Sequence, residues 1–128
     1  MLNRHRWLRP LACVLGLISV SVAPVAGAHA DRVGTDPAAG STVGSTGAQV
    51  AATFDEPLES TFASMSVVGP DGATWSTGDV VSSGNRLSVG VRTSGPAGVY
   101  TVAYRFLAAD GHVVTGSWSY SVEPESRP

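Results

Sequence analysis

Apolar and polar residues alternate with a period of two over several short stretches of this 128-residue chain. No other feature of the sequence constrains the fold as strongly. Such alternation is typical of β-strands with one buried face, because successive side chains of a strand point to opposite sides. No stretch shows a convincing helical period. Strands are predicted over residues 48–54, 62–68, 86–92, 98–106 and 114–122.

Turn-forming residues separate these segments, at Asp71-Gly72, Ser83-Gly84-Asn85 and Ser94-Gly95-Pro96. Glycine, proline, asparagine and aspartate favour turns because they accept or impose the backbone angles that turns need. Six or seven short strands in about 100 residues, with turns every eight to twelve residues, predict an all-β fold. The expected architecture is a small immunoglobulin-like Greek-key β-sandwich or barrel of about seven strands.

The first 28 residues have the layout of a secretory signal peptide. Three arginines lie before residue 10, an apolar run covers Leu11–Val22, and the small residues Ala26-Gly27-Ala28 follow. The run is too short to span a bilayer, which needs about 20 residues. We therefore expect an exported protein, periplasmic or extracellular, with no stable membrane anchor. Its predicted parts are a signal peptide over 1–28, one β domain over 29–122 and a short disordered tail over 123–128.

Cleavage after Ala28 would leave a mature chain of 100 residues with five arginines, ten carboxylates and a net charge of −5 when histidine is neutral. This balance argues against nucleic-acid binding, which needs clustered basic residues. Cys13 lies in the apolar run and would be removed, so the mature chain would have no thiol. Disulfides and a blue-copper centre, which requires a cysteine thiolate, are thereby excluded.

Two histidines remain in the mature chain, His29 and His112. As an amino-terminal residue, His29 would offer its α-amine and its imidazole Nδ1 to one metal ion, a pair that suits Cu(II). Alternatively, His29 is a signal-peptide residue of no consequence. Asp110 and His112 have an i, i+2 spacing that puts both side chains on one side of an extended chain. Alternatively, His112 is a hydrogen-bonded histidine at the edge of the core.

Other polar residues fall at the ends of predicted strands. Asp55 and Glu56 end the strand over 48–54, where Glu56 could reach the same rim as His112 or serve only solubility. Gly111 and Gly116 would let the backbone bend toward that rim. The remaining early carboxylates, among them Asp31, are interpreted as surface charge. Tryptophans and tyrosines lie in strand patterns and are expected in the core. A Ser-His-Asp hydrolase is not favoured, since no serine lies in a nucleophile-elbow motif.

Four segments together resemble the CopC family of periplasmic copper-binding proteins. The first is the lead from His29 to Pro37-Ala38-Ala39-Gly40-Ser41, and the second is Thr53-Phe54-Asp55-Glu56-Pro57. The third is the strand segment over 98–105 and the fourth is the segment over 109–116, which contains Asp110 and His112. The likeness covers essentially the whole mature chain, from His29 to about Val122.

The resemblance implies one Cu(II) ion per chain, bound by the amine and imidazole of His29, the imidazole of His112 and the carboxylate of Asp110. Glu56 matches a further carboxylate found in some members. A methionine-rich Cu(I) site is not expected, because Met65 is the only methionine of the mature chain. The implied function is a non-enzymatic, monomeric copper carrier or buffer in copper homeostasis, with delivery to a CopD-like membrane importer as a further role.

Two other functions are consistent with parts of the sequence. A copper polysaccharide monooxygenase also uses an amino-terminal histidine, although the carboxylates here would occupy the positions that oxygen needs. A metal-free immunoglobulin-like interaction module would result if His29 were lost. Ala28-His29-Ala30 is itself an Ala-x-Ala site, and cleavage after Ala30 would start the protein at Asp31.

Overall fold

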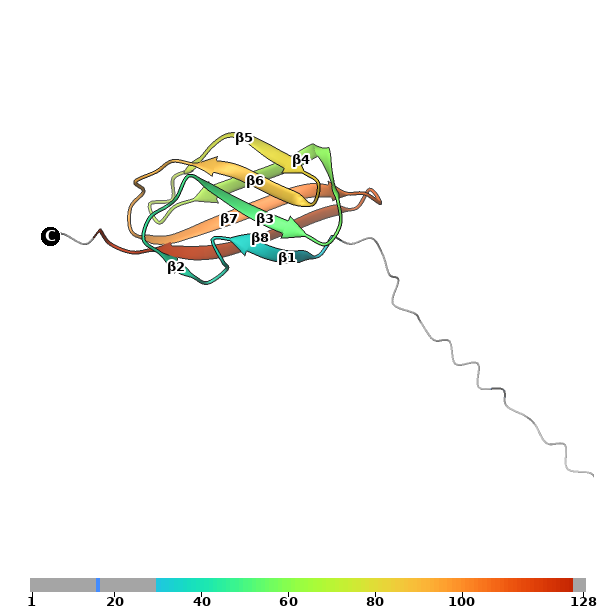
Figure 1. The fold of residues 1–128 in the computed structure, drawn as a ribbon, viewed down its shortest axis with the longest axis horizontal. Helices are drawn as coiled ribbons and strands as arrows, with labels where there is room; N and C mark the ends of the chain where they lie inside the picture. The colour runs from blue at the N-terminus through green and yellow to red at the C-terminus, as the bar shows by residue number, and fades with distance from the viewer. Residues whose placement is uncertain (1–15, 17–29, 126–128) are drawn as a thin grey trace, which may run out of the picture.

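The computed structural model describes Gly16 and residues 30–125, and the strands of this part form two packed sheets. One sheet has the strand order β1-β3-β6-β5, and the other has the order β2-β8-β7-β4, in which β2 pairs parallel to β8 (Figure 1). The strands are β1 (Arg32–Asp36), β2 (Thr42–Val43), β3 (Gln49–Phe54), β4 (Leu58–Val68), β5 (Ser76–Ser83), β6 (Arg86–Val91), β7 (Gly98–Ala108) and β8 (Val113–Val122).

This arrangement confirms the predicted all-β sandwich, with eight strands in the described part instead of about seven. The five strands predicted from alternation are β3, β4, β6, β7 and β8, although β4 begins earlier than expected, at Leu58. The three strands that were not predicted, β1, β2 and β5, all lie at sheet edges. Their side chains are mostly exposed or half-buried on both faces. Strands without a buried face need not alternate apolar and polar residues, so no sequence pattern identifies them.

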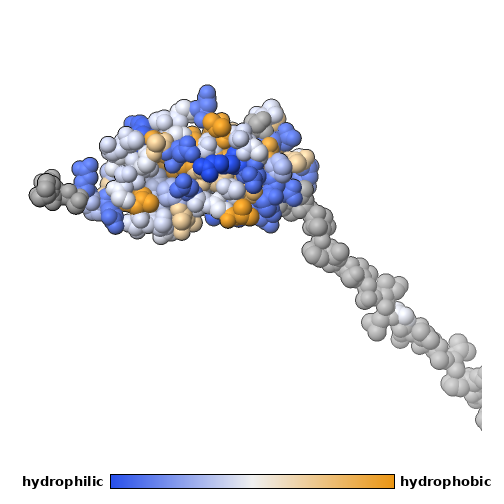
Figure 2. All heavy atoms as spheres, in the orientation of Figure 1, coloured by the Kyte–Doolittle hydropathy of each residue, from blue (hydrophilic) through white to orange (hydrophobic). Residues whose placement is uncertain are grey.

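Three segments outside the strands place several polar residues at one end of the sandwich. The chain enters β1 at this end, crosses from β3 to β4 through residues 55–57, and turns between β7 and β8 at residues 109–112. Figure 1 shows the β7–β8 turn and the entry to β1 at the same end of the molecule. We call this end the β7–β8 end. Figure 2 shows that hydrophilic residues gather there.

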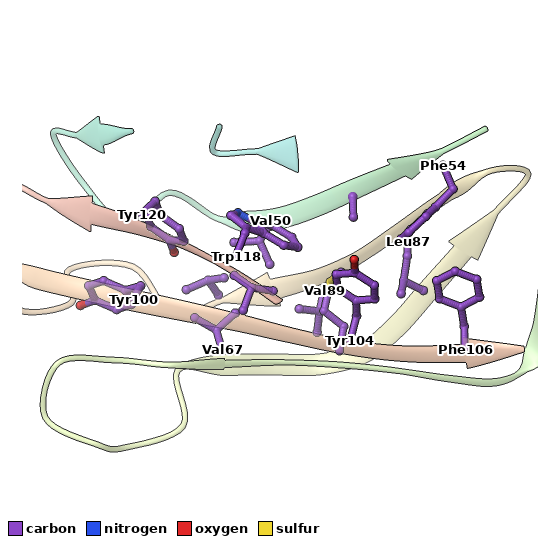
Figure 3. Packing of buried hydrophobic residues seen from close by; sticks show 14 of the residues in the cluster. Val50, Phe54, Val67, Leu87, Val89, Tyr100, Tyr104, Phe106, Trp118 and Tyr120 are labelled. Atoms are coloured by element: carbon purple, nitrogen blue, oxygen red, sulfur yellow. The ribbon is translucent and has the colours of Figure 1, made fainter. Parts of the chain in front are cut away.

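The core lies between the sheets and is rich in aromatic rings (Figure 3). Near the β7–β8 end, the rings of Phe54 and Phe106 pack edge to face with their centroids 4.6 Å apart. At the other end, the rings of Tyr100 and Tyr120 stack at 5.6 Å. Aromatic pairs of these kinds add to the free energy gained from burial. The turn at the β7–β8 end is therefore built on a packed base.

Alternation predicts the inward face of β3 with one exception. Val50 and Phe54 are fully buried as expected, but Ala51, on the opposite face, is buried as well. β3 lies between β1 and β6, and Ala51 is paired with Asp36 on one side and Ser88 on the other. A single methyl group between two flanking strands is easily covered.

The described part of the chain contains no helix long and apolar enough to cross a membrane.

Candidate metal site

The β7–β8 turn carries Asp110 and His112. The Gly111 amide donates to the Ala108 carbonyl at 2.9 Å, and the Ala108 amide donates to the His112 carbonyl at 2.8 Å. Gly111 has a φ of 85°, in the left-handed region that glycine adopts without steric cost. The Asp-Gly pair therefore closes a tight hairpin turn, and the two candidate ligands stand on either side of the glycine.

Asp110 contacts His112 with both carboxylate oxygens. Its Oδ1 accepts a hydrogen bond from the His112 backbone amide at 3.0 Å, and its Oδ2 lies 2.8 Å from the ring Nδ1. An ionised carboxylate only accepts hydrogen bonds, so in neutral His112 the proton of the ring belongs on Nδ1 and Nε2 keeps its lone pair. The ring is held in the tautomer that can bind a metal ion through Nε2.

The exposure of the pair matches a site that takes up an ion from solvent. The His112 side chain is 68% exposed, whereas that of Asp110 is 25% exposed. The alternative of a histidine at the edge of the core is therefore wrong. The two residues meet as expected, but through an Asx-type turn and not along an extended strand, because His112 precedes the first residue of β8.

Glu56 lies at the same end of the sandwich, in the crossing from β3 to β4, and is half-buried. Leu58 of β4 is paired with Ala108 of β7, so Glu56 and Asp110 each lie two residues beyond the same end of that strand pair. Even so, no three histidine, cysteine, aspartate or glutamate side chains within the described residues form a group that could hold a metal ion. The structure brings Asp110 and His112 together and does not bring Glu56 into contact with them.

The entry to β1 is fixed at this end as well. Ala30 is 5% exposed and belongs to the core cluster. The Asp31 amide donates to Asp55 Oδ1 at 2.7 Å, and the Asp55 amide donates to the Asp31 carbonyl at 2.9 Å. Asp31 is exposed, as expected for a surface charge, and these two hydrogen bonds use only its backbone. His29, the remaining predicted ligand, lies outside the described residues.

Gly116 and Arg32 make contacts across the sandwich that could not be read from the sequence. Gly116 lies opposite Tyr104 in the β7–β8 ladder, and a Cβ at position 116 would overlap the tyrosine ring. Position 116 is a glycine because a larger residue would overlap Tyr104, and this is a more specific explanation than the backbone bend expected from the sequence. Arg32 donates to the Ser117 carbonyl at 3.0 Å, and its guanidinium lies 5.6 Å from the centre of the Trp118 ring. The expected core positions of Trp118 and Met65 are confirmed.

These features define a small β-sandwich with an aspartate–histidine pair at one end. The CopC domain family model matches residues 32–123. This chain belongs to the CopC domain family. The comparison with curated proteins gives no match.

Two solved structures have the same fold. The first is CopC from Methylosinus trichosporium OB3b, which is 24% identical, with a TM-score of 0.66 over 78% of this chain and 99% of that one. The second is PcoC from Escherichia coli, described as a methionine-rich copper resistance protein. It is 22% identical, with a TM-score of 0.62 over 74% of this chain and 99% of that one.

Proposed function

We propose that this protein binds one Cu(II) ion outside the cytoplasmic membrane and acts as a non-enzymatic carrier or buffer in copper homeostasis. Membership in the CopC domain family supports the proposal, as does the likeness in fold to a copper resistance protein. The observation that carries it is the exposed imidazole of His112, oriented by Asp110 at the end of the sandwich where the chain enters from residue 29.

The proposed ligand set combines nitrogen and oxygen donors. His29 supplies its α-amine and imidazole, His112 supplies Nε2, and Asp110 and Glu56 supply carboxylates. Imidazole and amine nitrogens with a carboxylate favour Cu(II) in a tetragonal arrangement over the other divalent ions of the first transition row. Because the nitrogens must be deprotonated to bind, affinity falls as the pH is lowered.

The burial of Ala30 supports cleavage of the signal peptide before His29. A mature chain that began at Asp31 would lack a residue of the core cluster. The loss of one buried methyl group costs about 0.8 kcal/mol. A chain that begins at His29 keeps this contact and places its amino group one residue beyond a buried position. We therefore propose 1–28 as the signal peptide and His29 as the first residue of the secreted, monomeric protein.

The test starts from the intact mass and amino-terminal residue of the exported protein. Cu(II) affinity is then measured by competition with a chelator of known affinity. We expect one tight site per chain starting at His29 and a loss of at least a hundredfold in His112→Ala. Thr115→Ala, which alters another exposed residue of the same hairpin, is the matched control. An unchanged affinity in His112→Ala would refute the assignment.

Two altered amino termini separate the ligand role of His29 from its structural setting. The variant His29→Gly keeps the terminal amine at position 29 and the buried Ala30 but removes the imidazole. A chain starting at Asp31 lacks the imidazole and Ala30 and carries its amine two residues later. We expect both to lose tight Cu(II) binding, and only the shorter chain to lose stability through the missing core contact. Equal copper affinity in all three chains would show that the amino terminus takes no part.

Transfer of copper to a CopD-like membrane importer is the further role that we propose for this carrier. The exposure of His112 supports it, since an acceptor could reach the ion without opening the fold. Loss of copper-dependent growth or uptake on deletion of this gene, restored by the wild type and not by His112→Ala, would be the expected result. Restoration by His112→Ala would contradict it.

A further inference from the structure

Asp55 makes a contact that the copper site as described does not use. Its carboxylate Oδ1 accepts the Asp31 amide proton at 2.7 Å, and its own amide donates to the Asp31 carbonyl at 2.9 Å. The two residues are 24 positions apart in the sequence. Asp31 is only two residues after His29, so this pair of hydrogen bonds fixes the backbone next to the proposed amino-terminal ligand.

The position of Asp55 in the fold explains why a side chain is needed here. The β1–β3 ladder ends with the pair Arg32 and Phe54. Beyond Phe54 the chain leaves β3 and crosses to β4, so the regular ladder between β1 and β3 stops at this pair. The backbone amide of Asp55 still reaches the Asp31 carbonyl, and the Asp55 carboxylate takes the place of the missing backbone acceptor. A charged acceptor makes this hydrogen bond stronger than an ordinary ladder bond.

Arg32 anchors the same segment to the opposite sheet. Its guanidinium donates to the Ser117 carbonyl of β8 at 3.0 Å and lies 5.9 and 5.6 Å from the ring centres of Tyr104 and Trp118. β8 is the strand that follows His112. The entry to β1 is thus tied to β3 through Asp55 and to β8 through Arg32, and Ala30, which precedes Asp31, is buried in the core.

We propose that Asp55 is a positioning residue for the copper site, which holds the backbone at Asp31 so that His29 is presented to copper together with His112. This inference rests on the proposed function. Its carboxylate is engaged by the Asp31 amide, so the role of Asp55 differs from the ligand roles proposed for its neighbour Glu56 and for Asp110. Binding is tighter when the ligands are already ordered, because less conformational freedom is lost on association.

The test uses the mature secreted protein and the variants Asp55→Ala and Asp55→Asn. Alanine removes the acceptor, whereas asparagine keeps an oxygen that the Asp31 amide can use. Asp79→Ala, which removes an exposed carboxylate of β5, is the matched control. The first measurement is hydrogen exchange of the Asp31 amide in the metal-free protein, with the core amide of Val89 as the reference for folding. We expect faster exchange at Asp31 only in Asp55→Ala, with rescue in Asp55→Asn.

The second measurement is Cu(II) affinity together with the electron paramagnetic resonance spectrum, which reports how many nitrogens bind the metal. We expect Asp55→Ala to lose about tenfold or more in affinity, the scale of outer contacts around metal ligands, and to give a mixed spectrum. Asp55→Asn and Asp79→Ala should resemble the wild type. A folded Asp55→Ala with fast Asp31 exchange but unchanged affinity and spectrum would overturn the proposal. A wild type that binds no copper would instead overturn the proposed function itself.

Discussion

The carboxylate of Asp110 meets both the backbone amide and the imidazole Nδ1 of His112, at 3.0 and 2.8 Å. One side chain thus closes the β7–β8 turn and sets the orientation and tautomer of the ring. The imidazole does not have to be ordered when an ion arrives. A carboxylate that accepts a hydrogen bond from a ligand histidine raises the basicity of the ring, and in the proposed site Asp110 has this effect in addition to its role as a ligand.

Removal of this carboxylate should weaken copper binding without unfolding the domain. We expect Asp110→Ala to lower Cu(II) affinity by at least 10- to 100-fold, the range found when partners of metal ligands are deleted. Asp110→Asn keeps an oxygen that can accept from Nδ1 but loses the negative charge, so its affinity should be intermediate. Competition titrations measure both, with thermal unfolding as the check on folding. Wild-type affinity in Asp110→Ala would contradict this role.

The space above Tyr104 should restrict position 116 to glycine. A Cβ at this position would overlap the Tyr104 ring across the ladder. We expect Gly116→Ala to lower the free energy of unfolding by about 1–3 kcal/mol, the usual cost of overpacking a filled site. Urea unfolding measures the change, and Thr115→Ala on the same strand is the control. The double variant with Tyr104→Val should lose less than the sum of the two single changes, because the smaller side chain relieves the overlap.

The inner strands could be predicted from the sequence because their buried apolar residues alternate with residues on the opposite face, with a period of two. Leu87, Val89 and Val91 alternate with polar residues and are all buried in β6. The edge strands β1, β2 and β5 carry no such signal. Thr42 and Val43 form β2 through a parallel pairing with β8 that depends on the distant residues 121 and 122. Pairing of this kind is a tertiary property and leaves no local pattern.

In the candidate site as well, a contact between residues near in sequence could be predicted, and a contact between distant residues could not. Asp110 and His112 are close in sequence and flank a glycine, so their contact could be anticipated from local spacing. The contact between Asp31 and Asp55 could not, because both residues are exposed aspartates that would ordinarily repel each other. Asp31 takes part through its backbone amide and carbonyl, which are groups that every residue has, and Asp55 through its backbone amide and its carboxylate. Only the fold shows which amide lies beside which carboxylate.

Tyr100 and Tyr120, which stack in the core far from the β7–β8 end, should differ in how loss of the hydroxyl group changes the free energy of unfolding. The Tyr100 hydroxyl donates to the Pro96 carbonyl at 2.7 Å, whereas the buried Tyr120 hydroxyl has no hydrogen-bond partner among the described residues. We expect Tyr100→Phe to cost about 1 kcal/mol and Tyr120→Phe to be neutral or stabilising. Urea unfolding at neutral pH compares the two. A larger loss in Tyr120→Phe than in Tyr100→Phe would contradict this interpretation.

Tyr120 should also set the limit of stability at alkaline pH. Burial raises its pKa to about 12, with a smaller contribution from Tyr100. The unfolded chain releases this proton near pH 10, while the folded chain retains it, so the unfolded state is favoured as the pH rises. The stabilising effect of the neutral phenol is thus complete below about pH 9 and is lost between about pH 10 and pH 12.

The composition makes this alkaline transition easy to assign. All eight basic residues are arginines, so no lysine titrates in this range, and the chain has only three tyrosines. Arginine stays charged throughout. We expect the free energy of unfolding, measured in urea from about pH 8 to pH 11, to fall above about pH 10 in the wild type and to fall less in Tyr120→Phe. One pKa unit corresponds to about 1.4 kcal/mol, so the difference between the two curves should reach about 1.4 kcal/mol at pH 11, one unit above the pKa of the unfolded chain. Parallel curves would show that Tyr120 is not the group responsible.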